Sequence, residues 1–193
     1  RTELGTAALA AVPYDADEAQ PNCQRLGLKG KQYFNSGCLL IPPALWRERQ
    51  ITQRLLALCR EQWQEFLMPD QDALNVLFAD KPGAVQALPC RCNHMCNAFC
   101  PQPPIPAEGD VLLHFVNEGK PWYHGAAEPV QRLWGSYKAR SLWYDIPEFE
   151  PWDVKTTFYA GKNAEVRGDD REAAHYLGIA AERLLQYFLE QTG

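Results

Sequence analysis

Short apolar runs alternate along this chain with longer segments in which apolar residues recur at helical spacing. Residues 7–12 and 37–41 are compact apolar runs that predict buried strands, because each is too short for a helix of its own. Pro13 follows the first run as a turn signal. Pro42-Pro43 ends the second, and Pro43 suits the first turn of a helix. The polar residues 15–32 between the two runs predict a loop.

Later segments carry the periodicity of amphipathic helices. Apolar positions recur at roughly helical spacing in 45–66, and residues 129–144 are expected to form a short amphipathic helix. A further helix is expected to begin at Asp70, whose carboxylate suits the amino end of a helix. Asp169 is expected to cap a last, long helix. Residues 146–168, with two Pro, two Gly and scattered charge, predict a linker or irregular cover.

Two more apolar runs, residues 84–90 and 110–116, predict strands on either side of a stiff, proline-rich loop at residues 101–106. Strands that alternate with helices indicate an α/β arrangement. We expect residues 1–145 to form one α/β domain, followed at 146–193 by a linker and a C-terminal helix. A chain of 193 residues is long enough for one well-buried core.

Composition and charge narrow the class of protein. The apolar share of 46% and the charged share of 22% are those of an ordinary globular protein. A net charge of −5 argues against a general nucleic-acid binder, which needs a positive face. No apolar run reaches the length of a membrane span, and the first residues lack the pattern of a secretory signal. With seven Cys, an odd number, a reduced cytoplasmic compartment is expected.

The first motif with candidate chemistry is Tyr33-Phe34-Asn35-Ser36-Gly37. Asn35 offers an amide donor and acceptor, and Gly37 lets the backbone approach a ligand closely. Taken alone, the same residues also fit a turn that leads into a buried strand.

The second motif is Asp70-Gln71-Asp72. A carboxylate at the start of a helix points out of the sheet edge, where α/β folds usually bind ligands. Asp70 could there accept hydrogen bonds from sugar hydroxyls. The alternative is that Asp70 is only a helix cap and Asp72 a charge in the first turn.

The third motif runs from His114 through Lys120 to Pro121-Trp122. A neutral imidazole at the end of a strand can ligate a divalent metal. Lys120 can neutralise a phosphate in a loop that contains Gly119. A core histidine beside a surface lysine is the alternative.

The order and spacing of these motifs resemble the second half of a family 8 retaining glycosyltransferase, a group that includes glycogenin and bacterial lipopolysaccharide hexosyltransferases. The resemblance covers about residues 5 to 145. It implies the second half of a GT-A type α/β domain, with the nucleotide-binding half and its Asp-x-Asp motif upstream of Arg1. The implied reaction moves a hexose from a UDP-sugar to an acceptor hydroxyl with retention of configuration. The acceptor would be a glycan, glycolipid or protein, and the isolated chain is expected to be inactive.

The resemblance assigns the first two motifs to the donor sugar. Asn35, Ser36 and Gly37 would line its pocket. Asp70 would hold the sugar and Gln71 would lie near the anomeric carbon, which makes these two the expected catalytic residues. A glutamine at this position weakens a double-displacement scheme, because that scheme needs a carboxylate nucleophile.

The resemblance assigns the third motif to metal and diphosphate. His114 would ligate Mn²⁺, or Mg²⁺ in its place, and mixed imidazole and carboxylate ligands suit such an ion. Lys120 would bind the diphosphate together with Asn117 and Gly119. Asn117 departs from the family pattern, in which a Gly three residues after the His is common.

A dense cluster of thiols offers a rival interpretation. Four Cys and one His lie within eleven residues: Cys90, Cys92, His94, Cys96 and Cys100. A structural zinc site needs four such ligands, although these spacings are not a pair of C-x-x-C knuckles. The resemblance instead places this segment in an acceptor-facing loop, where Arg91 and Asn93 match a frequent Arg-x-Asn pattern. A small zinc-binding domain therefore remains an alternative function, as does a non-catalytic module that binds a sugar nucleotide.

Residues 134–144, from Trp134 to Tyr144, mix aromatic side chains with two cations. Helices of this composition often lie at membrane surfaces, and they also pack on their own domain. The resemblance to members that act on lipid-linked acceptors favours peripheral contact at the inner membrane face.

Overall fold

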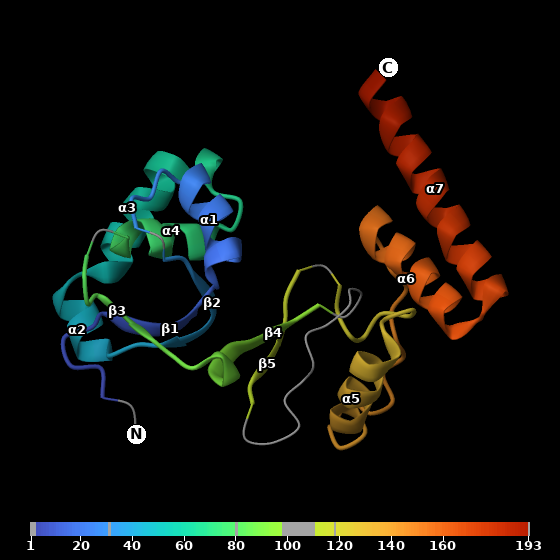
Figure 1. Cartoon of the computed structure of the whole chain (residues 1–193), viewed down its shortest axis with the longest axis horizontal. Helices are drawn as coiled ribbons and strands as arrows, with labels where there is room; N and C mark the ends of the chain where they lie inside the picture. The colour runs from blue at the N-terminus through green and yellow to red at the C-terminus, as the bar shows by residue number, and fades with distance from the viewer. Residues whose placement is uncertain (1–2, 31, 80, 98–110, 118, 193) are drawn as a thin grey trace. The chain divides into compact units, whose positions relative to one another are not determined.

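A computed structural model describes residues 3–30, 32–79, 81–97, 111–117 and 119–192. The chain divides into two compact units, which are described separately. The first unit comprises residues 1–94 and 110–112, and the second comprises 95–109 and 113–193 (Figure 1). Cys100, Glu118 and the expected proline-rich loop lie outside the described residues.

A three-stranded sheet forms the centre of the first unit. Its strands are β1 (Leu9–Pro13), β2 (Phe34–Leu40) and β3 (Val85–Ala87), in the order β2-β1-β3. β1 runs antiparallel to β2, with Ala10 opposite Leu40, and parallel to β3. Since β1 has neighbours on both sides, its nearly continuous apolar sequence matches its burial. The three expected strands of this unit and the α/β arrangement are confirmed.

The predicted loop at residues 15–32 is wrong over its first half. Helix α1 (Ala16–Arg25) occupies it, and Asp15 caps the helix by accepting from the Glu18 backbone N–H at 3.0 Å. Ala19 and Cys23 are the buried residues of the helix. An apolar stripe this narrow explains why periodicity did not reveal it.

The single helix predicted over residues 45–66 is divided into pieces. α2 (Pro43–Glu48) and α3 (Ile51–Gln62) are separated at Gln50, whose φ of +52° is left-handed, and a 3₁₀ turn, η1 (Trp63–Glu65), follows. Pro43 lies in the first turn of α2, as expected. α4 (Pro69–Phe78) begins one residue before the predicted start and carries Asp70 in its first turn.

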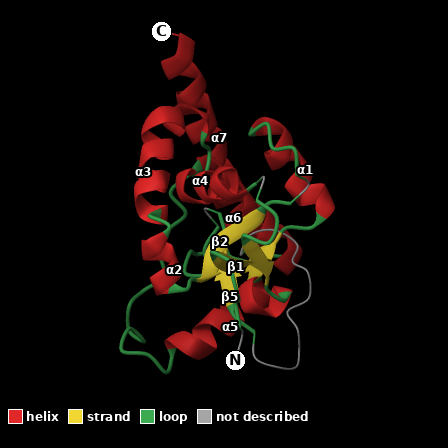
Figure 2. Cartoon of the chain, turned by 90° about the vertical axis from the view of Figure 1, so that its left-hand side faces the viewer, coloured by secondary structure: helices red, strands yellow, loops and turns green. Residues whose placement is uncertain are grey.

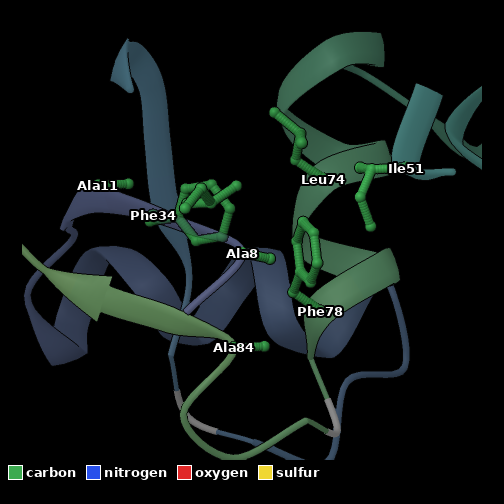
Figure 3. Packing of buried hydrophobic residues seen from close by; sticks show 8 residues of the cluster. Ala8, Ala11, Phe34, Ile51, Leu74, Phe78 and Ala84 are labelled. Atoms are coloured by element: carbon green, nitrogen blue, oxygen red, sulfur yellow. The ribbon is translucent and has the colours of Figure 1, made fainter. Parts of the chain in front are cut away.

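The core of the first unit lies between the sheet and the helices α3 and α4. Ile51, Leu74 and Phe78 pack against Phe34 of β2 and against small residues of the β1 segment (Figure 3). The alanines of that segment let the helices approach closely. The carboxylates at the start of α4 are therefore held against β2 by apolar packing further along the helix.

The second unit is mainly helical (Figure 2). A 3₁₀ turn of the first unit, η2 (Cys90–Asn93), leads into β4 (His94–Cys96), which pairs with β5 (Leu113–Phe115). β5 lies within the strand predicted at 110–116, and β3 of the first unit lies within the one predicted at 84–90; both are shorter than predicted. α5 (Glu128–Lys138) is also shorter than the predicted helix at 129–144.

Residues 146–168 are not a simple linker, because they contain α6 (Val154–Arg167). α6 forms a tight hairpin with α7 (Asp170–Thr192), joined at Gly168, whose φ of +77° is the left-handed conformation that ends many helices. Asp169 accepts from the Glu172 backbone N–H at 2.9 Å, which confirms its predicted cap. Within the described residues, none of these helices is long and apolar enough to cross a membrane.

Candidate functional site

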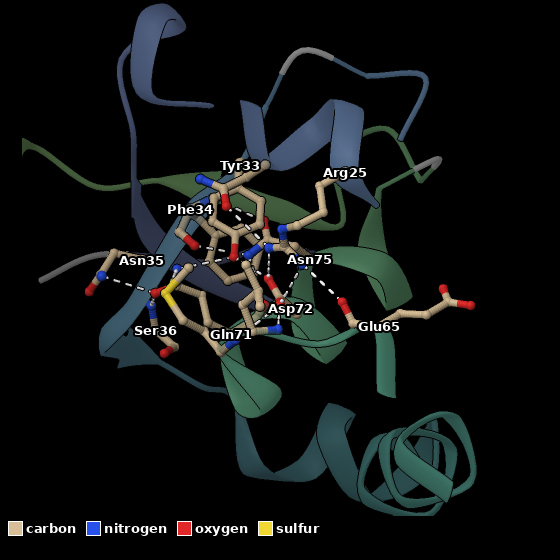
Figure 4. Close-up of polar contacts among 12 residues, drawn as sticks. Arg25, Tyr33, Phe34, Asn35, Ser36, Glu65, Gln71, Asp72 and Asn75 are labelled. Atoms are coloured by element: carbon tan, nitrogen blue, oxygen red, sulfur yellow. Dashed lines mark hydrogen bonds and ion pairs between the residues drawn. The ribbon is translucent and has the colours of Figure 1, made fainter. Parts of the chain in front are cut away.

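The first two sequence motifs meet in the first unit, where the start of α4 faces β2 (Figure 4). The Ser36 hydroxyl donates to Asp70 Oδ2 at 2.7 Å. Gln71 Oε1 accepts from Asn35 Nδ2 at 2.9 Å and from the Ser36 backbone N–H at 3.0 Å. Residues 34 positions or more apart in the sequence thus form one polar group, which we call the Asn35–Asp70 site and which comprises Asn35, Ser36, Asp70 and Gln71.

Asn35 is held from several directions. Its Oδ1 accepts from the Gly37 backbone N–H at 2.8 Å and from Asn93 Nδ2 at 2.8 Å. Its Nδ2 also donates to the Tyr14 hydroxyl at 3.1 Å. Asn93, at the end of η2, is only 1% exposed. The amide of Asn35 is therefore fixed in one orientation, and Asn93 gains a positional role that the sequence pattern alone did not supply.

Gln71 and Asp70 differ sharply in exposure. Gln71 is 3% exposed, and its Nε2 donates to the Tyr33 hydroxyl at 3.1 Å and contacts Met68 Sδ at 3.4 Å. Asp70 is exposed, and Ser36 occupies one of its two oxygens. The site thus presents the Asp70 carboxylate to solvent, whereas the Gln71 amide is buried and hydrogen-bonded at both its oxygen and its nitrogen. The expected place of Gln71 at an anomeric carbon stays a prediction.

Asp72 fixes the start of α4 through the hydrogen bonds that its carboxylate accepts. The Arg25 guanidinium donates to both carboxylate oxygens, at 2.8 and 3.0 Å, and the Tyr33 hydroxyl donates at 2.5 Å. The backbone N–H groups of Leu67 and Met68 add bonds of 2.8 and 3.1 Å. Burial raises the pKa of Asp72, but the hydrogen bonds from Arg25 and Tyr33 outweigh it and leave this pKa below its usual value.

Asn75 fastens the same helix to the strand. Its Oδ1 accepts from the Phe34 backbone N–H, and its Nδ2 donates to the Phe34 and Gln71 carbonyls, each at 2.9 Å. Sequence reasoning assigned no role to Asn75, Arg25 or Tyr33. The spacing of Asn75 four residues after Gln71, on the same face of a helix, was the one available signal for it.

The third motif lies in the second unit. His114 belongs to β5, and both its burial and the charge of Lys120 lower the pKa of the imidazole. The neutral form, which is the one that ligates metals, therefore persists to lower pH than usual. Lys120 Nζ donates to the Phe115 carbonyl at 2.5 Å, and Gly119 is buried. Asn117 has a φ of +60°, a left-handed conformation that glycine adopts freely and asparagine tolerates best among the rest.

No group of three or more His, Cys, Asp or Glu side chains suited to a metal occurs within the described part of the chain. His114 has the donor chemistry of a metal ligand, but it is one ligand and not a site. Cys90 and Cys92 lie on η2 and Cys96 is buried on β4, and among the described residues these thiols belong to no such group, which gives the rival zinc interpretation no support. Cys100, the last member of that prediction, lies outside the described residues.

Comparison with known proteins identifies a family model and several relatives. The family model "Glycosyl transferase family 8" matches residues 1–126. Lipopolysaccharide glucosyltransferase WaaO of Escherichia coli (strain K12) is 29% identical over 163 residues, which cover 81% of this chain and 48% of that protein. Lipopolysaccharide 1,3-galactosyltransferase of Salmonella typhimurium is 27% identical over 136 residues, covering 68% of this chain and 40% of that protein.

A solved structure matches as well. The galactosyltransferase LgtC, crystallised with donor and acceptor sugar analogs, superposes with a TM-score of 0.53 at 27% identity and covers 70% of this chain and 54% of its own. The match confirms the expected GT-A fold class. The chain spans about half the length of WaaO and of LgtC.

Proposed function

This chain belongs to glycosyltransferase family 8, and from that premise we propose that the protein moves a hexose from a UDP-sugar to an acceptor hydroxyl with retention of anomeric configuration. The observation that carries the proposal is the Asn35–Asp70 site. Residues expected to surround a donor sugar lie within hydrogen-bond distance of one another, and the one ionised side chain among them is exposed.

In this proposal Asp70 contacts the hexose directly. Ser36 occupies Oδ2, whereas Oδ1 has no hydrogen-bond partner among the described residues and can accept from a sugar hydroxyl. Such a bond has an ionised acceptor, and bonds of this kind are stronger than neutral ones. Gln71 supports the site, because its side chain holds the Asn35 amide and the Ser36 backbone N–H in place. As a neutral amide, Gln71 contributes polarity near the anomeric carbon and not the carboxylate nucleophile of a double displacement.

We assign the diphosphate end of the donor to the third motif. Lys120 supplies a positive charge next to buried Gly119, and Asn117 gives the loop its left-handed turn. His114 is offered as one ligand of Mn²⁺ or Mg²⁺, kept neutral by its lowered pKa. Such an ion, when bound, acts as a Lewis acid toward the leaving diphosphate.

The acceptor is proposed to be a sugar hydroxyl of a glycan or glycolipid, in line with the lipopolysaccharide transferases that the chain resembles. Contact with the inner membrane face is part of this proposal. Leu142, Trp143 and Tyr144 are 90%, 69% and 67% exposed, which suits peripheral insertion at a lipid surface.

Transfer of labelled hexose by the native protein tests the proposal. With UDP-glucose and UDP-galactose as donors, we expect a product whose anomeric configuration, determined by proton NMR, equals that of the donor. Asp70→Asn is expected to lower kcat/KM about ten- to a hundredfold, the value of one hydrogen bond to a charged group. The control is Asp17→Asn, an exposed aspartate in the first turn of α1, with unchanged kcat/KM. An inverted product, or equal rates for the two variants, would reject the proposal.

A further inference from the structure

The second unit contains a pocket with an unusual lining. Its volume is about 310 Å³, at the small end of the range for ligand sites. We call it the aromatic pocket. Its lining comes from the turn before α5, from α5 itself and from the segment that follows: Trp122, Trp134, Tyr137, Lys138, Ser141, Trp143, Ile146, Pro147 and Phe149. Aromatic and aliphatic side chains make up most of this surface, which excludes a strongly hydrated ligand.

The Ser141 hydroxyl and one ammonium N–H of Lys138 are already engaged by the protein. The Ser141 hydroxyl donates to the Lys138 carbonyl at 2.9 Å and accepts from the Trp143 backbone N–H at 3.2 Å. Lys138 Nζ donates to the Ile146 carbonyl. A hydrocarbon chain needs no hydrogen-bond partner, and it suits the aromatic and aliphatic side chains that make up most of the lining.

One cation of the lining suits the polar end of a ligand. The Lys138 ammonium carries three N–H groups, and the bond to the Ile146 carbonyl uses one of them. None of the residues that line the pocket is Asp or Glu. The charge of the pocket is therefore complementary to an oxygen acceptor that carries negative charge.

We propose that the aromatic pocket binds one hydrocarbon chain of an anionic, single-chain amphiphile, with the anionic oxygens directed to Lys138. The ring contact between Trp122 and Trp134, with centroids 5.4 Å apart, gives the hydrocarbon chain of the ligand a rigid apolar wall. This uptake differs from contact with a bilayer, which needs only the exposed side chains around the pocket. It is also independent of the transfer reaction, because no residue of the lining belongs to the Asn35–Asp70 site or to the residues proposed to bind the metal and the diphosphate.

Equilibrium dialysis of the 193-residue chain against radiolabelled dodecanoate, kept below its micelle concentration, tests the proposal. We expect saturable binding of one dodecanoate per chain and much weaker binding of dodecyltrimethylammonium, which has the same chain and the opposite charge. Lys138→Met keeps an unbranched apolar stem and removes the charge, and it should weaken dodecanoate binding about five- to tenfold. Ser141→Phe places a ring inside the pocket and should abolish saturable binding.

Lys155→Met is the matched control, because Lys155 is exposed in the same unit but does not line the pocket. Its dodecanoate affinity should equal that of the wild type, and the circular dichroism of all three variants should show that they fold. Equal binding of the two amphiphiles would overturn the proposal. So would saturable binding that survives in folded Ser141→Phe, or association with phosphatidylglycerol vesicles without any uptake of monomeric dodecanoate.

Discussion

Asp72 is the residue on which the geometry of the candidate site depends most. Its side chain is fully buried, and it is paired with an Arg25 side chain that is 24% exposed. Removal of one partner of a buried ion pair leaves the other charge uncompensated. Because Arg25 keeps some contact with water, we expect Asp72→Asn to lower the free energy of unfolding by about 2–4 kcal/mol.

Urea-induced unfolding followed by circular dichroism measures this loss. Asp17→Asn, a change of the same kind at an exposed position in α1, should stay within about 0.5 kcal/mol of the wild type. If the two variants have the same stability, Asp72 is not the anchor that its hydrogen bonds indicate.

The same residue predicts a pH dependence. The pKa of Asp72 is lower in the folded protein than its usual value, so the unfolded chain takes up the proton first as pH falls. The stabilising contribution of Asp72 is therefore complete above about pH 4, the unfolded pKa, and is lost as pH falls through the folded pKa. The stability gap between wild type and Asp72→Asn should narrow on acidification in urea titrations between about pH 6 and pH 3. A gap that stays constant would contradict the ionised state of Asp72.

For individual residues, the sequence predicted more of the Asn35–Asp70 site than of the residues that hold that site in place. Asn35, Ser36, Asp70 and Gln71 could be proposed together because short motifs carry them. Arg25 could not be, since it lies in a segment read as a loop and reaches Asp72 across 47 positions. A partner contributed by tertiary structure leaves no local pattern.

Among the elements, the α6–α7 hairpin shows how small residues set a packing distance. A Cβ added at Gly161 would lie 2.7 Å from Leu177 Cγ and 3.2 Å from the Leu177 backbone nitrogen, whereas one at Gly178 would meet nothing within 4 Å. Gly161→Ala should therefore lower the free energy of unfolding by about 1 kcal/mol, because overpacking exceeds the gain in helix propensity. Gly178→Ala, the same change in the neighbouring helix, should raise it by roughly 0.5–1 kcal/mol. Thermal unfolding of both variants decides the matter, and a stabilised Gly161→Ala protein would show that the helices are not so close.

The elements that sequence reasoning missed are those without a broad apolar stripe. α6 buries Thr156, Thr157, Ala160, Gly161 and Ala164. Small and hydroxyl-bearing residues of this kind also suit a loop, so the pattern indicated a linker. The strands β1 and β2 were easier to predict, because each contains a compact apolar run; in β1 this run reflects the burial of the central strand of the sheet.

For the whole molecule, the division into two compact units makes energetic changes in them separable. Asp72 belongs to the first unit and Gly161 to the second, and the described structure gives them no shared partner. The double variant Asp72→Asn, Gly161→Ala should therefore lose the sum of the two single losses within about 0.5 kcal/mol. Urea titration of the four proteins in this cycle measures the coupling. A coupling above 1 kcal/mol would mean that the two cores depend on each other.

The central claim concerns what the first unit binds, and saturation-transfer difference NMR on this chain with UDP-glucose and UDP-galactose tests it most directly. The account predicts that protons of the hexose ring receive saturation from the protein. It further predicts that Asp70→Asn reduces this signal strongly and that Asp17→Asn leaves it intact. A hexose without saturation, or one whose signal is the same in both variants, would contradict a donor-sugar site built on Asn35, Ser36, Asp70 and Gln71.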